Sequence, residues 1–213
     1  RFWPVCRCRP GYEFVKSGAL GRPLSATAKR LSARPTWGDW FANPEWTGGA
    51  VLDLQVHDLD MLNWLFGTPE TVYARGQKGM FGGWDHALTL LDYGEVKAYA
   101  EGTTLMPEGY PFTMALAVLC EKGSVEYSFR AGGTGVETGP ASGTSLMVYE
   151  AGKEPRPLTS VPGDGYENQV AAFIECVRTG RTPDRATAEE GRLAVQTALA
   201  ARQSLETGEV VRF

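Results

Sequence analysis

The 213-residue sequence lacks the features that mark several large classes of protein. It has no run of Lys or Arg and a formal net charge of −4, so nothing in it indicates nucleic-acid binding. Its apolar stretches are far shorter than the roughly 20 residues that span a bilayer, which predicts no membrane segment. With 43% apolar residues, the chain is long enough to bury a sizeable core. We therefore expect one globular domain over residues 1–213.

Histidine and cysteine are scarce, which limits metal chemistry. The two histidines, His57 and His86, have no further ligand at metal-binding spacing, and Cys6-x-Cys8 is closer than the usual zinc pairs. We predict no metal site, and a structural role for His86. No signal peptide is visible, so the four cysteines are predicted to be reduced structural thiols, which favours the cytoplasm. They are Cys6, Cys8, Cys120 and Cys176.

A glycine-rich turn for a dinucleotide is also missing. Such a turn reads Gly-x-Gly-x-x-Gly and opens a helix whose N-terminus binds the pyrophosphate. The glycine clusters at 79–83 and 132–135 have no amphipathic helix after them and are typical of hairpins or loops. These residues alone are therefore not expected to bind a dinucleotide.

The order of predicted elements indicates the fold class. A short helix at 12–17 and a strand at 24–31 precede a long helix, and a run of strands follows with no crossover helix between them. These strands are predicted at 71–77, 86–93, 96–103, 112–120, 124–129 and 145–150. Capping-box spacings at Asp164/Glu167 and Thr187/Glu190 open two later helices, which end at Gly180 and Gly208 before a last strand at 210–213. The prediction is an α+β fold: an open, mainly antiparallel sheet with helices on one face.

The uncovered face of such a sheet has a consequence for assembly. The strand at 112–120 is apolar on both faces, so its outer side chains would be left exposed. A sheet of this kind is expected to pack on a copy of itself.

The long helix, predicted over 48–67, carries the most informative pattern. At about 100° per residue, Asp53, His57, Asp60 and Trp64 fall within roughly 60° of one another, while apolar residues occupy the opposite half. The ordinary interpretation of such a polar stripe is that it is the solvent-exposed side of an amphipathic helix. However, a solvated stripe normally carries Lys, Glu or Gln rather than short carboxylates, an imidazole and an indole. We therefore expect this stripe to face a substrate.

The spacing within the stripe permits acid–base chemistry. Asp53 and His57 are four residues apart, so the carboxylate can accept a hydrogen bond from one ring nitrogen, orient the ring and favour its protonated form. The other nitrogen would then take a proton from a substrate. Asp58, on the buried side of the helix, should have a partner such as Arg or a backbone N–H.

Gly48-Gly49 followed by Asp53-x-x-x-His57-x-x-Asp60 resembles the C-terminal domain of the glucose-fructose oxidoreductase / inositol dehydrogenase family of NAD(P)-dependent sugar and polyol dehydrogenases. Further segments that resemble the family span almost the whole chain: 1–4, 15–21, 92–95, 121–126, 166–173, 179–183 and 207–211. One departure is Gln55, where many members have Gly; it points away from the stripe and is expected to affect helix packing.

This resemblance implies both a fold and an activity. The fold would be like the C-terminal domain of glyceraldehyde-3-phosphate dehydrogenase. The activity would be hydride transfer between a nicotinamide and a sugar, polyol or related hydroxyl or ketone compound, with Asp53 and His57 as the catalytic residues. NAD or NADP would be bound mainly by an N-terminal Rossmann domain, which these residues do not contain, and the family's catalytic Lys is missing with it. Since residue 1 is Arg, we expect a fragment of a two-domain enzyme that is inactive alone.

Substrate contacts are predicted around the same helix. Asp60 would bind a hydroxyl, and Asn43 in the preceding loop is a further candidate. Trp46 and Trp64 would either stack on a sugar ring or pack in the core.

Two other functions stay open. A chain that is complete as it stands would be a non-catalytic dimerisation or carbohydrate-binding module. A hydrolase or lyase that uses Asp53 and Asp60 as a carboxylate pair is the third interpretation, and hydrolysis without nicotinamide would favour it.

Overall fold

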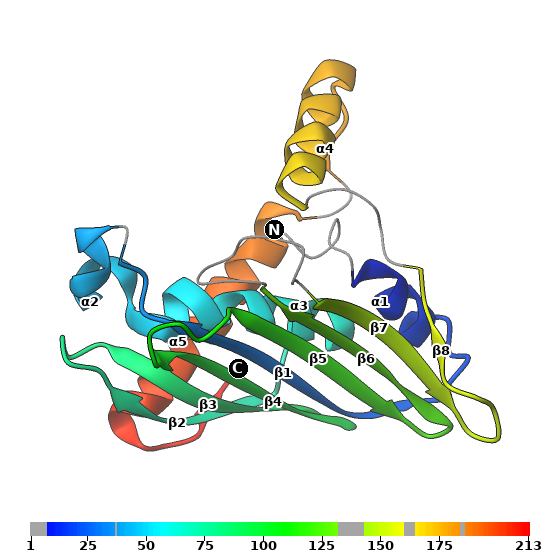
Figure 1. Ribbon diagram of the computed structural model, residues 1–213, viewed down its shortest axis with the longest axis horizontal. Coiled ribbons are helices and arrows are strands. Elements are labelled where there is room, and N and C mark those ends of the chain that lie inside the picture. Colours follow the sequence, from blue (N-terminus) through cyan, green and yellow to red (C-terminus); the bar gives the residue numbers. More distant parts are fainter. Residues whose placement is uncertain (1–7, 37, 132–142, 160–164, 184–185) are drawn as a thin grey trace.

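The computed structural model describes residues 8–36, 38–131, 143–159, 165–183 and 186–213 (Figure 1). Their strands form one sheet in the order β8-β7-β6-β5-β1-β4-β3-β2-β9. The bounds are β1 Pro23–Ala33, β2 Thr71–Lys78, β3 Trp84–Tyr93, β4 Val96–Met106, β5 Thr113–Cys120, β6 Gly123–Arg130, β7 Gly143–Glu150, β8 Arg156–Pro157 and β9 Val211–Arg212. Every neighbouring pair is antiparallel except β1 and β4, which run parallel in the middle of the sheet.

Helices cover one face of this sheet (Figure 1). Helix α3 (Val56–Phe66) packs on β1 and β4, and α5 (Ala188–Thr207) packs on β2, β3 and α3. Helix α1 (Arg9–Lys16) covers β6 and β7 at the other end. The predicted α+β fold with helices on one face is confirmed. Helix α4 (Gly165–Thr179) differs, because it stands away from the sheet with an exposed apolar stripe.

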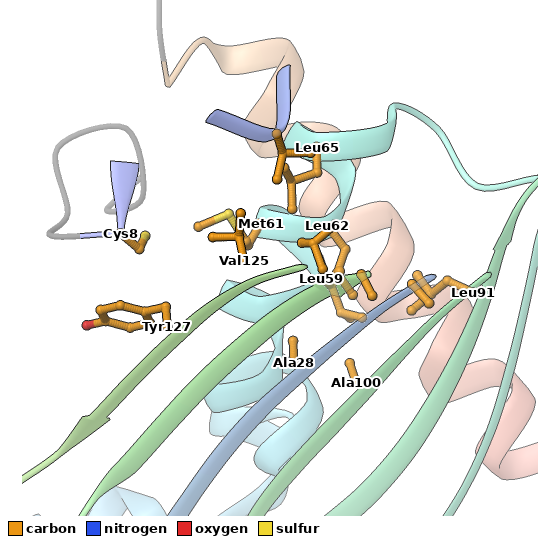
Figure 2. Packing of buried hydrophobic residues seen from close by; sticks show 14 of the residues in the cluster. Cys8, Ala28, Leu59, Met61, Leu62, Leu65, Leu91, Ala100, Val125 and Tyr127 are labelled. Atoms are coloured by element: carbon orange, nitrogen blue, oxygen red, sulfur yellow. The ribbon is translucent and has the colours of Figure 1, made fainter. Parts of the chain in front are cut away.

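The core lies between α3 and the central strands (Figure 2). Leu59 and Leu62 are completely buried against strands that present alanines, including Ala28 and Ala100. Small side chains on the strands let the helix approach closely, and its leucines fill the space. Burying each leucine stabilises the fold by about 1.5–3 kcal/mol.

Local signals placed several helix ends correctly. Thr187 and Glu190 form the predicted capping box of α5, and Gly208 ends that helix with φ 78°. Gly180, with φ 65°, follows α4 as predicted. Asp164 lies outside the described residues. In the part of the chain that the structure describes, no helix is long and apolar enough to cross a membrane.

Two expectations from the sequence need correction. No strand was predicted between the strand at 145–150 and the helix that ends at Gly180, yet β8 pairs with β7 at Arg156–Pro157. Cys8 is disulfide-bonded, so the prediction that all four cysteines are reduced is wrong, and the argument for the cytoplasm loses that support. Cys120 and Cys176 are free thiols, and Cys6 lies outside the described residues.

Candidate active site

The helix with the polar stripe begins at two glycines. Gly48 ends the short helix α2 (Pro44–Thr47) with φ 75°, and Gly49 follows with φ 71°. A Cβ at Gly49 would lie 2.8 Å from the carbonyl oxygen of Trp84, so both the backbone angle and the close approach require glycine. The pair turns the chain directly against the start of β3.

A π-helical turn, η3 (Val51–Gln55), comes next and continues into α3. The sequence predicted one regular helix over 48–67, and a uniform 100° step cannot reveal a wider turn. Such turns occur frequently at functional sites. Here the turn carries Asp53, while His57 stands in the first turn of α3.

Gln55 fixes this turn to the sheet. Its amide nitrogen donates to the carbonyl oxygens of Ala87 (3.1 Å) and Ala100 (3.0 Å), and its amide oxygen accepts from the Thr89 hydroxyl (3.0 Å). The side chain is fully buried. The expected packing role of Gln55 is confirmed.

Asp58 has the partner that its burial required. The Arg30 guanidinium donates to both carboxylate oxygens, at 2.9 Å and 3.1 Å. Both side chains are buried, at 7% and 2% exposure. This pair joins α3 to β1 beneath the predicted site.

Asp53 lines a pocket together with Arg34, Phe41, Gly49, Asp85 and Thr104. The side chain is half-buried, and desolvation raises the pKa of its carboxyl group. Among the described residues, no hydrogen bond engages this carboxylate. It is therefore available to a ligand.

His57 lies on the exposed side of α3. Partial desolvation by surrounding atoms, followed by the positive charge of Arg30, lowers its pKa to about 4. Within the described chain no hydrogen bond joins Asp53 to His57. The expectation that Asp53 favours the protonated form is wrong, since the ring is neutral at pH 7 and can accept a proton.

The other residues predicted to contact substrate do not share one accessible surface. Asp60 is only 6% exposed. Trp64 stacks on Tyr12 of α1, with ring centroids 3.4 Å apart, and packs against the core. Trp46 is 73% exposed, and Asn43 caps α2 by accepting a hydrogen bond from the Glu45 amide. The substrate roles of these four residues stay predictions.

The residues on the far side of the pocket carry no sequence motif and were not predicted. Arg34 follows β1, pairs with Asp85 at the start of β3 and lies over the Phe81 ring, 4.6 Å from its centroid. Position 79, beside this pair, requires glycine, because a Cβ there would lie 1.9 Å from an Asp85 carboxylate oxygen. The glycines of the 79–83 hairpin were the available signal of this close approach.

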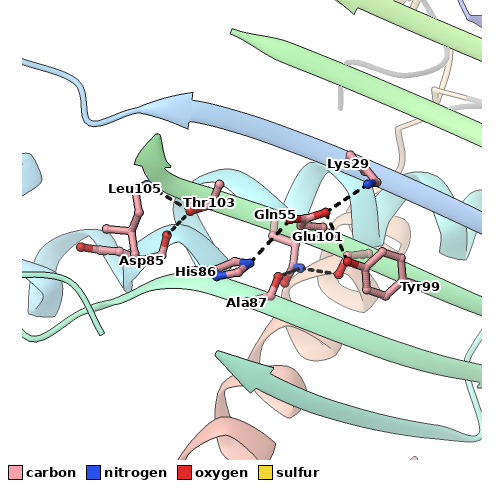
Figure 3. A network of polar contacts seen from close by, with 10 residues as sticks. Lys29, Gln55, Asp85, His86, Ala87, Tyr99, Glu101, Thr103 and Leu105 are labelled. Carbon is pink, nitrogen blue, oxygen red and sulfur yellow. Dashed lines mark hydrogen bonds and ion pairs between the residues drawn. The ribbon is translucent and has the colours of Figure 1, made fainter. Parts of the chain in front are cut away.

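His86 belongs to a polar cluster on the uncovered face of the sheet (Figure 3). Glu101 accepts a hydrogen bond from the Tyr99 hydroxyl, and its carboxylate lies 3.3 Å from Lys29 and 3.7 Å from His86. Among the described residues, no group of three or more His, Cys, Asp or Glu side chains has a metal-binding arrangement.

The GFO/IDH/MocA C-terminal domain model matches residues 12–126, more than half of the chain. The chain belongs to this family. The match includes the helix with Asp53 and His57 and the pocket beside it, and it confirms the resemblance found in the sequence.

Relatives extend the match over almost the whole chain. D-xylose 1-dehydrogenase (NADP(+)) 2 of Haloferax volcanii is 28% identical over 207 residues, which are 94% of this chain and 59% of that protein. A putative NADPH-dependent oxidoreductase from Desulfitobacterium hafniense shares the fold with a TM-score of 0.81 at 19% identity, over 99% of this chain and 63% of that one. Aldose-aldose oxidoreductase from Caulobacter crescentus, solved with glycerol, has a TM-score of 0.77 at 19% identity, over 95% and 59%. The chain thus spans about three fifths of the length of these relatives.

The nicotinamide cofactor that the family uses does not fit the described residues of this member. A dinucleotide needs a glycine-rich turn between a strand and the helix that follows it. Gly48 and Gly49 follow the short helix α2 rather than a strand, and the Trp84 backbone lies against Gly49, so this turn is not the strand–turn–helix that binds a pyrophosphate.

Proposed function

We propose that this chain is the substrate-binding half of an NAD(P)-dependent oxidoreductase acting on a sugar, polyol or related hydroxyl compound. The observation that carries the proposal is the presence of two ionisable groups, Asp53 and His57, at the start of one helix. Asp53, with a raised pKa, lines a pocket, and His57, with a pKa of about 4, follows one turn later.

Each group has a role in the oxidation of a secondary alcohol. The neutral His57 ring accepts the hydroxyl proton, which a protonated ring does not. Asp53 binds and orients a substrate hydroxyl at the pocket. A nicotinamide held by the cofactor half would supply the hydride acceptor for this oxidation.

The cofactor half is part of the proposal. We expect it on roughly 100–150 further residues of the same polypeptide. The intact mass of the native gene product tests this expectation. A mass about 11–16 kDa above 23.2 kDa supports it, whereas a mass of 23.2 kDa favours the non-catalytic module.

The activity is tested on that complete gene product with NADP⁺ or NAD⁺ and neutral aldoses and polyols. His57→Gln should lower kcat by about 10²–10⁴-fold with a smaller change in KM, because general-base catalysis contributes about that much. His86→Gln is the matched control and should keep the wild-type kcat. Equal kcat in all three proteins would remove His57 as the base.

Self-association through the uncovered sheet face is the second part of the proposal. This face exposes Leu88, Leu90, Leu119 and Tyr149, and the described helices do not cover it. Apolar side chains gathered on one face are typical of an interface.

A further inference from the structure

The pocket beside Asp53 is built from segments far apart in the sequence. Arg34 directly follows β1, Asp85 lies on β3 and Thr104 on β4, while Gly49 and Asp53 lie at the start of the long helix. The strands β3 and β4 hold Asp85 and Thr104 in a fixed arrangement.

Arg34 is held in place but keeps free donors. Asp85 binds one terminal nitrogen, Nη2, and the Phe81 ring lies 4.6 Å from the guanidinium carbon. The side chains of Arg34 and Asp85 are 23% and 10% exposed. A guanidinium carries five N–H donors, and no other hydrogen bond of Arg34 is formed within the described residues.

The opposite wall supplies acceptors. The Asp53 carboxylate has a raised pKa through desolvation, and neither it nor the Thr104 hydroxyl has a hydrogen-bond partner in the described part of the chain. The pocket thus presents a donor, an acceptor and a hydroxyl that is both. A few convergent polar groups of this kind are what orients a small ligand.

The charges of the pocket residues favour an uncharged ligand over an acidic one. Arg34 is neutralised by Asp85, and Asp53 adds a further negative charge when it is ionised. The pocket therefore has no net positive charge to offset that of a carboxylate or phosphate, whereas an uncharged hydroxyl can donate to Asp53 and accept from Arg34.

We propose that Arg34, Asp53 and Thr104 form a subsite that binds hydroxyl groups of a neutral aldose or polyol and excludes acidic sugars. Asp85 is a positioning residue that holds the guanidinium. This inference rests on the proposed function and names the substrate class for the same site.

The test uses the complete gene product and separates KM from kcat with D-xylose or D-glucose. Arg34→Met should raise KM about 10–100-fold with little change in kcat, as expected for the loss of a charged hydrogen bond. Thr104→Val should raise KM about 2–10-fold. This second variant leaves no charge unpaired, so it still tests the subsite if Arg34→Met does not fold. Arg22→Met is the matched control, because Arg22 pairs with Glu121 on the exposed surface.

A second comparison tests the charge argument. Wild-type kcat/KM should favour D-glucose over D-glucuronate by at least about tenfold, and Asp85→Asn should reduce this ratio because it removes a negative charge. Unchanged KM in both Arg34→Met and Thr104→Val, or a wild-type preference for D-glucuronate, would overturn the subsite and leave the proposed function standing. A wild-type protein that oxidises no sugar or polyol would overturn both.

Discussion

The ionisation of His57 connects the site to the stability of the fold. The pKa of this ring is about 4 in the folded chain, against 6.5 for an unperturbed histidine. Between these values the unfolded chain binds a proton that the folded chain does not. Stability is therefore complete above pH 6.5 and falls as the pH drops through 6.5 toward 4.

Removing the ring should remove this part of the pH dependence. Urea unfolding at pH 7.5 and pH 5.0 measures it, and we expect a smaller loss of stability on acidification in His57→Gln than in the wild type. His86→Gln serves as the control. Identical losses in the wild type and His57→Gln would contradict the lowered pKa.

Breaking the Arg30–Asp58 pair should also lower the stability of the fold. Its two hydrogen bonds join α3 to β1 in the core. Arg30→Met leaves a buried carboxylate unpaired and should cost about 3–5 kcal/mol in the free energy of unfolding. Arg30→Met with Asp58→Leu should cost less than Arg30→Met alone, because no charge then remains. Urea unfolding decides, and a double variant less stable than the single one would refute the argument.

Single residues could be predicted only where chemistry demands a partner. The position of Asp58 on the buried side of a helix required a cation or N–H donor, and the structure supplies Arg30. Which arginine it would be depends on how α3 packs on β1, a contact between segments far apart in the sequence that no local pattern encodes. Arg34 was missed for the same reason, because its role depends on Asp85 across the sheet.

At the scale of elements, the π-helical turn packs closely on the sheet beneath it, and this contact requires a small residue on β4. Gly102 of β4 lies under Gln55, and a Cβ at Gly102 would lie 2.7 Å from the Gln55 Cβ. Gly102→Ala should therefore cost about 1–3 kcal/mol by overpacking. In a Gln55→Gly background the obstructing atom is gone, so the same substitution should cost less. A double-mutant cycle by urea unfolding measures this coupling, and additive effects would rule out the contact.

The elements that the sequence predicted well are those set by local rules. Alternating strands bounded by turns and the Thr187–Glu190 capping box were placed to within a few residues. The π-helical turn was not foreseen, because three hydrogen bonds of Gln55 to the sheet hold it. Strand β8 consists of two residues and is formed by pairing with β7 alone.

At the scale of the whole molecule, the two faces of the sheet differ. One face is covered by α1, α3 and α5. The other carries a row across three strands, in which Leu90 lies between Tyr73 and Tyr99. Leu90 is 53% exposed in this row. An isologous interface centred on this row would bury the leucines of both copies against each other.

Leu90→Glu should therefore weaken self-association. A symmetric interface receives the substitution twice, and each new carboxylate would be buried against apolar side chains, so we expect the dissociation constant to rise at least about 100-fold. Leu199→Glu is the matched control, because Leu199 is a similarly exposed leucine on α5, over the covered face. Sedimentation velocity over a concentration series distinguishes the outcomes. An assembled wild type and Leu199→Glu, with Leu90→Glu as single protomers, would support the sheet face as the interface, whereas a monomeric wild type or an assembled Leu90→Glu would rule it out.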